Sequence, residues 1–465
     1  MEAPATWGRA ALLVAAAAAL VALGDLHALT NADAIVPVLV SLQRWTPFYW
    51  DQERYGMLVP LLAAPVTHPL WNLLLQRFLT GAAALGAVML LDRHVLARPE
   101  WRAEGALAAA LLVLLAPPVW SFEYLWSQPY GLSLGVALLG LAFAEPAPGS
   151  FHPARGLPRA VRLAIGLALV LVAHWVNGAA GLLLLPLAAV RAAVDLSEGE
   201  PRGDVRSRFA VDGALLLAGL VASEAWSTRY SALLPASGWP AGWAALAREA
   251  WSMAWRWGLS LAALAAVGIW ARRREGPHLV AGLRRAGALV AAALAYALLA
   301  GTLRWVAANG FHWRYVIPSA LLLHLAALSL LPPWRRAWLL TPLAALLAFG
   351  VPSLARVRAD LDRTCGALTP AVRAARCDAI GGDYWTVWPA VWHAEWDRRE
   401  RGEPGHLYGL AFRAAPTVPL WARAGARVCV PRGQEAAAES GFQAFGLAAA
   451  PTGKGGGDLA VFTLR

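Results

Sequence analysis

Charged residues are scarce in this sequence. Only 15% of its 465 residues are Asp, Glu, Lys or Arg, whereas 58% are hydrophobic. A soluble chain carries about a quarter charged residues. The shortage excludes an ordinary soluble protein, and repeated apolar runs near the length of a bilayer predict a polytopic membrane protein. The first run lacks a convincing small-residue cleavage pattern, which favours a retained helix over a signal peptide.

Cysteine is scarce as well. The three Cys form no Cys-x-x-Cys pair and no cluster with His, so the sequence has no zinc or redox motif. Cys365 and Cys377 lie twelve residues apart and bracket a predicted short helix. An oxidising compartment permits a disulfide between them, but two buried thiols fit the sequence equally, since spacing does not fix the side-chain directions.

The net charge of +11 comes almost entirely from arginine. A basic chain can bind nucleic acid, but these arginines fall in short loops between apolar runs, which is the topology signal of a membrane protein. We therefore expect membrane lipids, and no nucleic acid, as partners. The alternate loops are rich and poor in arginine, so the positive-inside rule predicts a cytoplasmic N-terminus and an exported C-terminal part. The rich loops carry Arg93/98/102, Arg155/159/162, Arg202/206/208, Arg272/273/274/284/285 and Arg335/336.

The pattern of apolar runs predicts an all-α membrane domain over residues 1–355 and a small soluble α/β domain over 356–465. In the second domain, the stretches TVPLWA, ARVCVP and DLAVFTLR are predicted as strands and LTPAVRAARC as a short helix. The eleven predicted spans cover about 10–29, 70–91, 104–120, 128–144, 161–175, 178–193, 209–225, 258–271, 286–303, 315–332 and 337–355.

The outer loop 30–66, which follows the first span, is the candidate site. Charge placed against a bilayer is costly and usually has a function. Asp33 can act as a base or hold a divalent cation, or it can cap a helix beginning at ADAIVPVL. Asp51 and Glu53 offer a second acidic position and Arg54 a fork for phosphate, although an ordinary surface ion pair explains them equally well.

Further polar residues lie at the outer ends of later spans. Glu123 is expected to be solvated in the short loop SFEYLWSQPY, and His174 to form a hydrogen bond at a helix interface. Arg304 and Arg314 oppose the positive-inside trend, so they either bind a lipid phosphate or extend to the headgroups. Three more residues complete the set: His312 and Tyr315 beside Arg314, and His324 within a span, where a helix–helix hydrogen bond is expected.

Several stretches resemble one family. FYWDQERYGMLVPLLAAPV is similar to a segment of bacterial integral-membrane glycosyltransferases of the protein-mannosyltransferase-like kind, which have the GT-C fold. AHWVNGAAGLLLLP resembles that family's junction of spans five and six, and HWRYVIPSALLLHLA resembles the beginning of a late span. GGDYWTVWPAVW resembles an element of some members' C-terminal domains, and Asp33 follows the first span, where the family keeps an acidic motif.

The resemblance implies a transferase of the bacterial inner membrane that acts on the periplasmic or exterior face. Such enzymes take a sugar from a polyprenyl-phosphate carrier, usually with inversion, and pass it to a glycan, lipid or protein. Asp33 would then be the catalytic carboxylate, with Asp51 and Glu53 as further acids. Arg54, Arg304 and Arg314 would hold the lipid phosphate.

The sequence departs from the family pattern in the acidic motif after the first span, which bears on metal binding. Many members carry two adjacent acids after the first span, whereas this chain has Asn31-Ala32-Asp33-Ala34. A divalent cation would need Asp51, Glu53 or Glu123 as further ligands, and the sequence requires none. A flippase or transporter for a lipid-linked glycan, or a glycan polymerase, is the alternative function. A flippase would also use outer arginines and many spans, but the mid-span ionisable residues that it needs are scarce here. A polymerase would have different family motifs but similar chemistry.

Overall fold

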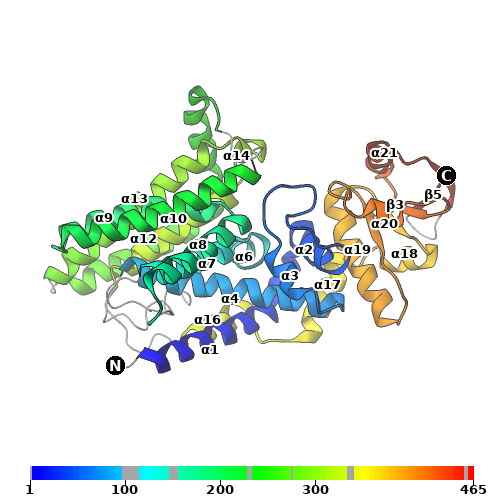
Figure 1. Ribbon diagram of the computed structural model, residues 1–465. Coiled ribbons are helices and arrows are strands. Elements are labelled where there is room, and N and C mark those ends of the chain that lie inside the picture. Colours follow the sequence, from blue (N-terminus) through cyan, green and yellow to red (C-terminus); the bar gives the residue numbers. More distant parts are fainter. Residues whose placement is uncertain are drawn as a thin grey trace. The chain divides into compact units, whose positions relative to one another are not determined.

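The computed structural model describes residues 3–96, 115–145, 156–227, 233–273, 276–331, 340–454 and 459–465. The chain divides into two compact units (Figure 1). Unit 1 comprises Met1–Leu20 and Thr80–Ala348, and unit 2 comprises Val21–Leu79 and Phe349–Arg465. The predicted outer loop 30–66 therefore belongs to the same compact unit as the C-terminal residues 356–465. The predicted domain boundary at residue 355 stays a prediction.

Unit 1 is built from helices, because its long Ala- and Leu-rich runs satisfy their backbone polar groups internally. Its described elements, including those that cross its boundary, are α1 (Ala3–Ala22), α4 (Pro69–Leu96), α6 (Pro118–Phe122), the π-helical turn η2 (Glu123–Ser127), α7 (Tyr130–Ala144), α8 (Arg159–Val176), α9 (Ala179–Ser197), α10 (Arg202–Trp226), η3 (Ala236–Gly238), α12 (Trp239–Arg272), α13 (Gly276–Gly301), α14 (Arg304–Ala308), η4 (Trp313–Val316), α15 (Ile317–Leu328) and α16 (Leu340–Phe349).

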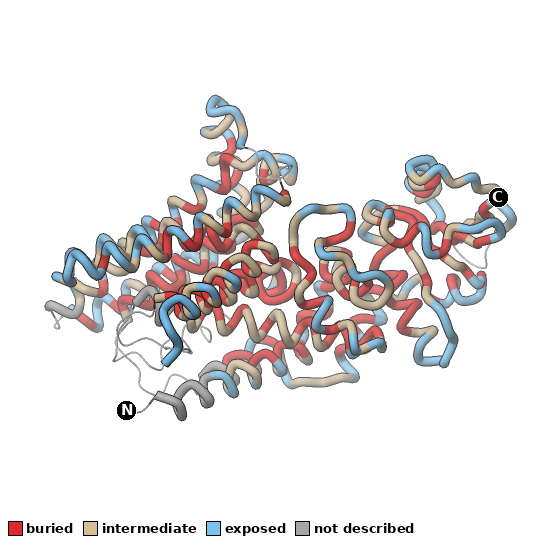
Figure 2. The backbone as a smooth tube through the Cα atoms, viewed as in Figure 1, coloured by how far each residue is buried: buried red, intermediate tan, exposed pale blue. Residues whose placement is uncertain are grey.

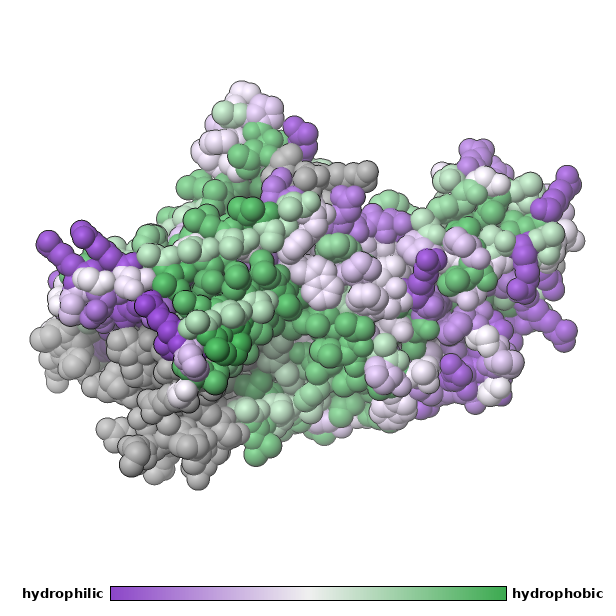
Figure 3. All heavy atoms as spheres, in the orientation of Figure 1, coloured by the Kyte–Doolittle hydropathy of each residue, from purple (hydrophilic) through white to green (hydrophobic). Residues whose placement is uncertain are grey.

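The helices of the described residues include five that are long and apolar enough to cross a membrane. Two bent helix pairs raise the number to seven if each pair makes one span. Figure 3 shows hydrophobic side chains over α8, α9 and α10, and hydrophilic ones at the α9–α10 connection. The chain is thus a polytopic membrane protein. Eleven spans stay a prediction, because much of the third and parts of the last two fall outside the described residues.

Close packing of α7 against α8 depends on glycine. A Cβ added to Gly140 would lie 2.8 Å from the carbonyl oxygen of Gly166, and one added to Gly166 would lie 2.8 Å from the Cβ of Ala144. Small residues let helix backbones approach closely, which is how helices associate where apolar burial supplies no driving force between them. Figure 1 shows the two helices alongside each other.

Unit 2 combines helices with a sheet. Its elements are η1 (Asp25–Leu29), α2 (Ala32–Leu42), α3 (Leu58–Ala63), α17 (Leu354–Cys365), α18 (Thr369–Ala375), β1 (Ala379–Gly381), α19 (Tyr384–Glu400), β2 (Tyr408–Leu410), α20 (Val418–Trp421), β3 (Arg427–Pro431), α21 (Glu435–Ala444), β4 (Ala449–Lys454) and β5 (Leu459–Leu464). The five described strands have the order β2-β1-β3-β5-β4. β1 is parallel to β2 and β3, whereas β5 is antiparallel to β3 and β4.

The core of unit 2 joins its two chain segments. Trp388 and Trp392 of α19 are fully buried, as is Trp50 from the outer loop. Figure 2 shows where buried residues lie along the chain, α19 among them. The rings of Trp50 and Trp388 have centroids 5.4 Å apart. Burying three Trp side chains removes several hundred Å² of surface from water, which stabilises this core by several kcal/mol. Loop 30–66 is therefore a folded part of unit 2, held through α2 and Trp50.

The structure corrects the predicted cysteine pairing. Cys377, just before β1, is bonded to Cys429 of β3, with 5.8 Å between the Cα atoms. Cys365 keeps its thiol and is buried in α17. The Cys365–Cys377 disulfide, which the sequence left open against two thiols, does not form, because β1 and β3 are neighbouring strands that place Cys377 beside Cys429. Their pairing brings residues 52 positions apart together.

Three local predictions differ from the structure. The first predicted span ends early: α1 stops at Ala22, and residues Asp25–Leu29 form the separate helix η1. The stretch SFEYLWSQPY is not a loop but the buried turns α6 and η2. TVPLWA contains α20 instead of a strand, because Pro419 cannot donate to a ladder and suits the first turn of a helix. The helix in LTPAVRAARC and the strands in ARVCVP and DLAVFTLR are confirmed.

Candidate functional site

Asp33 lies in the first turn of α2 and is partly buried. The helix is capped by Asn31, whose side-chain oxygen accepts a hydrogen bond from the Ala34 amide at 3.1 Å. The alternative that Asp33 caps this helix is therefore excluded, because Asn31 is the cap. A carboxylate in the first turn is favoured by the partial positive charge of the helix N-terminus.

The Asp33 carboxylate contacts α19. The Tyr384 hydroxyl donates to Asp33 Oδ1 at 2.6 Å, and the hydroxyls of Tyr384 and Tyr49 lie 2.8 Å apart. A carboxylate only accepts hydrogen bonds, and each phenol has one proton to donate. Tyr384 must therefore give its proton to Asp33, which makes Tyr49 the donor to Tyr384. Burial, followed by the nearby Tyr49 and Asp33, raises the pKa of Tyr384, so this hydroxyl keeps its proton.

Arg413 covers this hydroxyl chain. Its guanidinium lies 4.6 Å from the ring centroid of Tyr49 and 5.7 Å from that of Tyr384, within the range of cation–π attraction. Its Nη1 donates to the Trp50 carbonyl at 3.2 Å. The backbone at Arg413 is left-handed, with φ at 78°. A non-glycine residue is uncommon there, and such strain gathers at functional sites.

Asp51 belongs to the same neighbourhood. Burial raises the pKa of its carboxyl, whereas a hydrogen bond from the Ala415 backbone and the charge of Arg413 lower it. The residue is still exposed to solvent, and its backbone φ is 57°. Arg413 thus lies near Asp51 and over Tyr384, the residue that donates to Asp33.

The rest of the predicted acidic loop is more open. Glu53 is exposed. Arg54 lies 4.3 Å from the ring centroid of Tyr55, and its Nε donates to Gln52 Oε1 at 3.2 Å. These contacts orient Arg54 from within its own loop.

The other end of α2 is also fixed to α19. Gln43 follows α2, and its Nε2 donates to Glu395 Oε2 and to the Leu407 carbonyl, each at 2.8 Å. Glu395 is buried, and its second oxygen takes a short contact from His406 Nδ1. α2 therefore has a polar contact with α19 near each of its ends.

The Glu395–His406 contact predicts a dependence of stability on pH. The hydrogen bond to Glu395 raises the pKa of His406 more than burial lowers it. A raised pKa adds stability that is complete below the unfolded value of about 6.5 and is lost as the pH rises through the folded value. We expect the Tm of wild type to exceed that of His406→Gln at about pH 5.5, and this difference in Tm to become smaller by about pH 8.5. Differential scanning fluorimetry measures both Tm values, and a difference that stays constant with pH would contradict this source of stability.

Four predicted residues lie in unit 1, around η4. Arg304 is exposed at the start of α14. Arg314 is partly buried, and its Nη2 donates to Asn309 Oδ1 at 3.3 Å and to the Tyr315 hydroxyl at 3.4 Å. His312 precedes η4 and accepts a hydrogen bond from the Arg314 amide at 3.3 Å. The short helix thus holds Arg314, His312 and Tyr315 as one group.

The remaining predicted residues of unit 1 are buried. Glu123 begins the π-helical turn and is 7% exposed, so the expectation that it is solvated is wrong. The aromatic residues around it fold the stretch into buried turns. His174 is buried at the end of α8, where its Nδ1 bonds the Val170 carbonyl at 2.8 Å. His324 is fully buried in α15.

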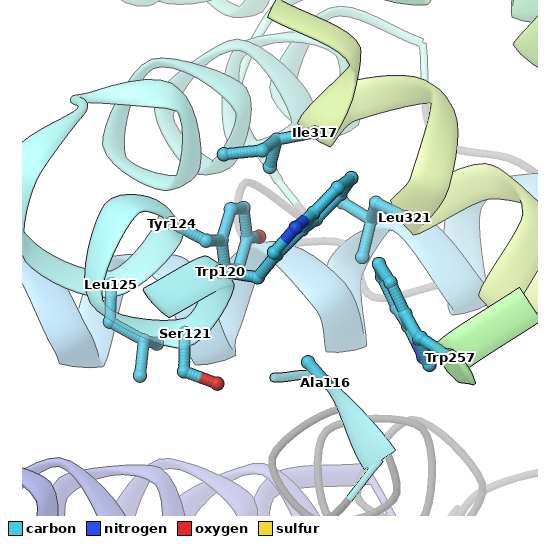
Figure 4. Close-up of a pocket in the computed structure, with 8 residues that line it drawn as sticks. All are labelled: Ala116, Trp120, Ser121, Tyr124, Leu125, Trp257, Ile317 and Leu321. Carbon is cyan, nitrogen blue, oxygen red and sulfur yellow. The ribbon is translucent and has the colours of Figure 1, made fainter. Parts of the chain in front are cut away.

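An apolar pocket also lies in unit 1 (Figure 4). It holds about 350 Å³ of empty space, part of it open to solvent. The Trp120 ring in its wall stacks on Trp313 of η4, with centroids 5.1 Å apart, and meets Trp257 edge-on. Tyr124 and Leu321 complete much of the wall. The wall of the pocket is mostly apolar.

A metal site was one expectation for the outer loop. The residues that the structure describes contain no group of three or more His, Cys, Asp or Glu side chains placed to hold a metal ion. Asp33 Oδ1 instead receives the Tyr384 hydroxyl. A divalent cation at this site stays an expectation from the sequence, and the chemistry below takes no step through one.

The sequence did not indicate that three further residues lie around Asp33. Tyr384 lies in the quoted stretch GGDYWTVWPAVW, but nothing in the sequence connects it with Asp33, 351 positions away. Tyr49 lies within the quoted outer loop. Arg413 follows no motif, and only its left-handed backbone sets it apart.

Comparison with known proteins gives a weak structural likeness. No protein-family profile and no curated protein sequence matches the chain. Among solved structures, it is similar to ArnT from Cupriavidus metallidurans bound to undecaprenyl phosphate, with 13% identity and a TM-score of 0.38 over 99% of this chain and 98% of that one. At this TM-score the likeness carries no argument about this protein.

Proposed function

We propose that this protein is a GT-C-type glycosyltransferase. It takes a sugar from a polyprenyl-phosphate carrier on the exterior face of the membrane and passes it to a hydroxyl of a glycan, lipid or protein. The observation that carries the proposal is the Asp33 carboxylate at the N-terminus of α2, held by Tyr384 beside Arg413. The family-like stretches in the outer loop and around HWRY support it.

The proposed reaction is an inverting displacement. Asp33 takes the proton of the acceptor hydroxyl as its oxygen bonds to the anomeric carbon of the sugar. The bond from that carbon to the phosphate oxygen breaks, and its electron pair leaves with the polyprenyl phosphate. Cations that stabilise the departing phosphate make its protonation unnecessary. The expected products are the glycosylated acceptor and free polyprenyl phosphate.

Arginines are the proposed phosphate ligands. The family resemblance points to Arg54, Arg304 and Arg314. The planar guanidinium suits a phosphate because it donates two parallel hydrogen bonds. Arg314 is held by Asn309 and Tyr315, which limits the freedom it would lose on binding. The aromatic pocket of unit 1 suits the apolar chain of the carrier.

A flippase or transporter for a lipid-linked glycan, or a glycan polymerase, is the rival function. The deciding assay incubates purified protein in detergent with a polyprenyl-phosphate monosaccharide and measures free polyprenyl phosphate by mass spectrometry. We expect release that depends on an added acceptor. Movement of the intact carrier across vesicles, without release, would favour the flippase.

The topology predicts where reporters become active. We propose a cytoplasmic N-terminus and exported residues 356–465, from the arginine asymmetry of the loops. Alkaline phosphatase fused after Arg465 should be active, and the same enzyme fused at Arg202 should be inactive. Green fluorescent protein at the two positions should give the reverse pattern. A fluorescent C-terminal fusion would contradict both the orientation and the exterior placement of Asp33.

A further inference from the structure

We propose that Tyr384 is a positioning residue for the Asp33 carboxylate, so that the C-terminal segment completes the site on the outer loop. The inference rests on the proposed function. Its starting observation is the 2.6 Å hydrogen bond from the Tyr384 hydroxyl to Asp33 Oδ1, which joins residues 351 positions apart within unit 2.

The hydroxyl chain has one direction. Tyr49 donates to Tyr384, which donates to Asp33, because the carboxylate can only accept. A hydrogen bond to a charged acceptor is about twice as strong as a neutral one, so it fixes the rotamer of the carboxylate well. A base positioned in this way loses less freedom when the acceptor hydroxyl arrives.

Tyr384 is itself fixed by its surroundings. It is the first residue of α19, whose N-cap Asp383 accepts hydrogen bonds from the amides of Trp385 at 2.9 Å and Thr386 at 3.2 Å. The Asp383 amide in turn donates to Gln434 Oε1 at 3.0 Å, so β3 and α21 hold the cap through the turn between them. Arg413 lies over the Tyr384 ring. These contacts leave the phenol little room to turn away from Asp33.

The two helices are in register. Asp33 and Gln43 are ten residues apart along α2, and their partners Tyr384 and Glu395 are eleven apart on α19. At 1.5 Å per residue the two intervals come to roughly 15 and 16.5 Å, so α2 and α19 run in the same direction and are linked near both ends of α2. One link holds the proposed base, and the other lies about three turns from it. The chain thus supplies a matched control for a purely structural contact.

The test compares the two links in the full chain, using the polyprenyl-phosphate release assay. We expect Tyr384→Phe to lower kcat roughly 10- to 100-fold with KM within about twofold, because only the position of the base changes. Gln43→Leu should lower Tm and leave kcat within about twofold, because it breaks only the distant link. Equal kcat losses in both variants would show that Tyr384 matters only for stability, and would overturn the proposal.

A double-mutant cycle makes the dependence on Asp33 measurable. In an Asp33→Asn background, Tyr384→Phe should change the residual kcat by less than about twofold, because no base remains to be positioned. Tyr49→Phe, which keeps the Tyr384–Asp33 bond, should lower kcat about threefold in wild type and have no effect beside Asp33→Asn. It serves as the second probe where Tyr384→Phe fails to fold. Additive losses in these cycles would overturn the proposal.

The same assays distinguish a failure of the proposed function from a failure of the role of Tyr384. Wild type that releases no polyprenyl phosphate from any lipid-linked sugar would remove the proposed function, and this inference with it. Wild-type release that is lost in Asp33→Asn, together with additive losses for both tyrosine variants, would keep the function and remove only the role of Tyr384.

Discussion

Asp33→Asn is expected to insert, fold and form the Cys377–Cys429 bond, yet to lose roughly 10²- to 10⁴-fold in turnover. The amide has nearly the size of the carboxylate, and its oxygen can still accept the Tyr384 hydroxyl. It cannot take a proton from the acceptor. The loss should appear in kcat and equally in kcat/KM, which identifies an interaction made only in the transition state.

The structure shows that Asp33→Asn tests the carboxylate without disturbing the helix cap. Asn31 caps α2, so replacing Asp33 does not remove the cap. Losing the carboxylate from the first turn costs the helix only about 0.3–1 kcal/mol. Asn31→Ala is the matched control, which should cost about 1 kcal/mol in stability and leave turnover nearly intact. Near-normal transfer by Asp33→Asn would reduce Asp33 to a structural residue and make Asp51 or Glu53 the next candidate base.

Loss of the Cys377–Cys429 bond should give the largest effect on stability. The bond closes a loop of 52 residues, for which the chain-entropy relation predicts about 4 kcal/mol. We expect the double variant Cys377→Ser, Cys429→Ser to unfold at a much lower urea concentration in detergent, as measured by the alkylation of Cys365, which becomes accessible when unit 2 unfolds. Both serine hydroxyls also enter a core, which adds to the loss.

Cys365→Ala is the matched control for the disulfide. It removes a sulfur that forms no disulfide, so the Cys377–Cys429 link persists and the loss of stability should be smaller. Burial raises the pKa of the Cys365 thiol to about 11, so it should resist alkylation at neutral pH until the chain unfolds. Native protein in which Cys377 and Cys429 are both alkylated without reductant would contradict the pairing.

Some features of the site followed from sequence, and others required distant contacts. Asp33 stood out because an acid directly after an apolar run is costly and therefore rare. Its partner could not be found in the same way. Tyr384 looks like any tyrosine at a helix start, and only the packing of α2 on α19 places its hydroxyl against Asp33. Arg413 is equally ordinary in sequence, and its role depends on a left-handed backbone.

The sequence by itself determined the helical, membrane-spanning character of the chain, because the length and apolarity of a run are local properties that a bilayer selects directly. It also determined β3, β5 and α18, whose patterns are local. Tertiary structure alone decided that Cys377 pairs with Cys429, that Glu123 is buried, and that residues 21–79 fold with 349–465. Each of these depends on which distant segments pack together, and that choice is made by the summed burial of the whole core rather than by any one stretch.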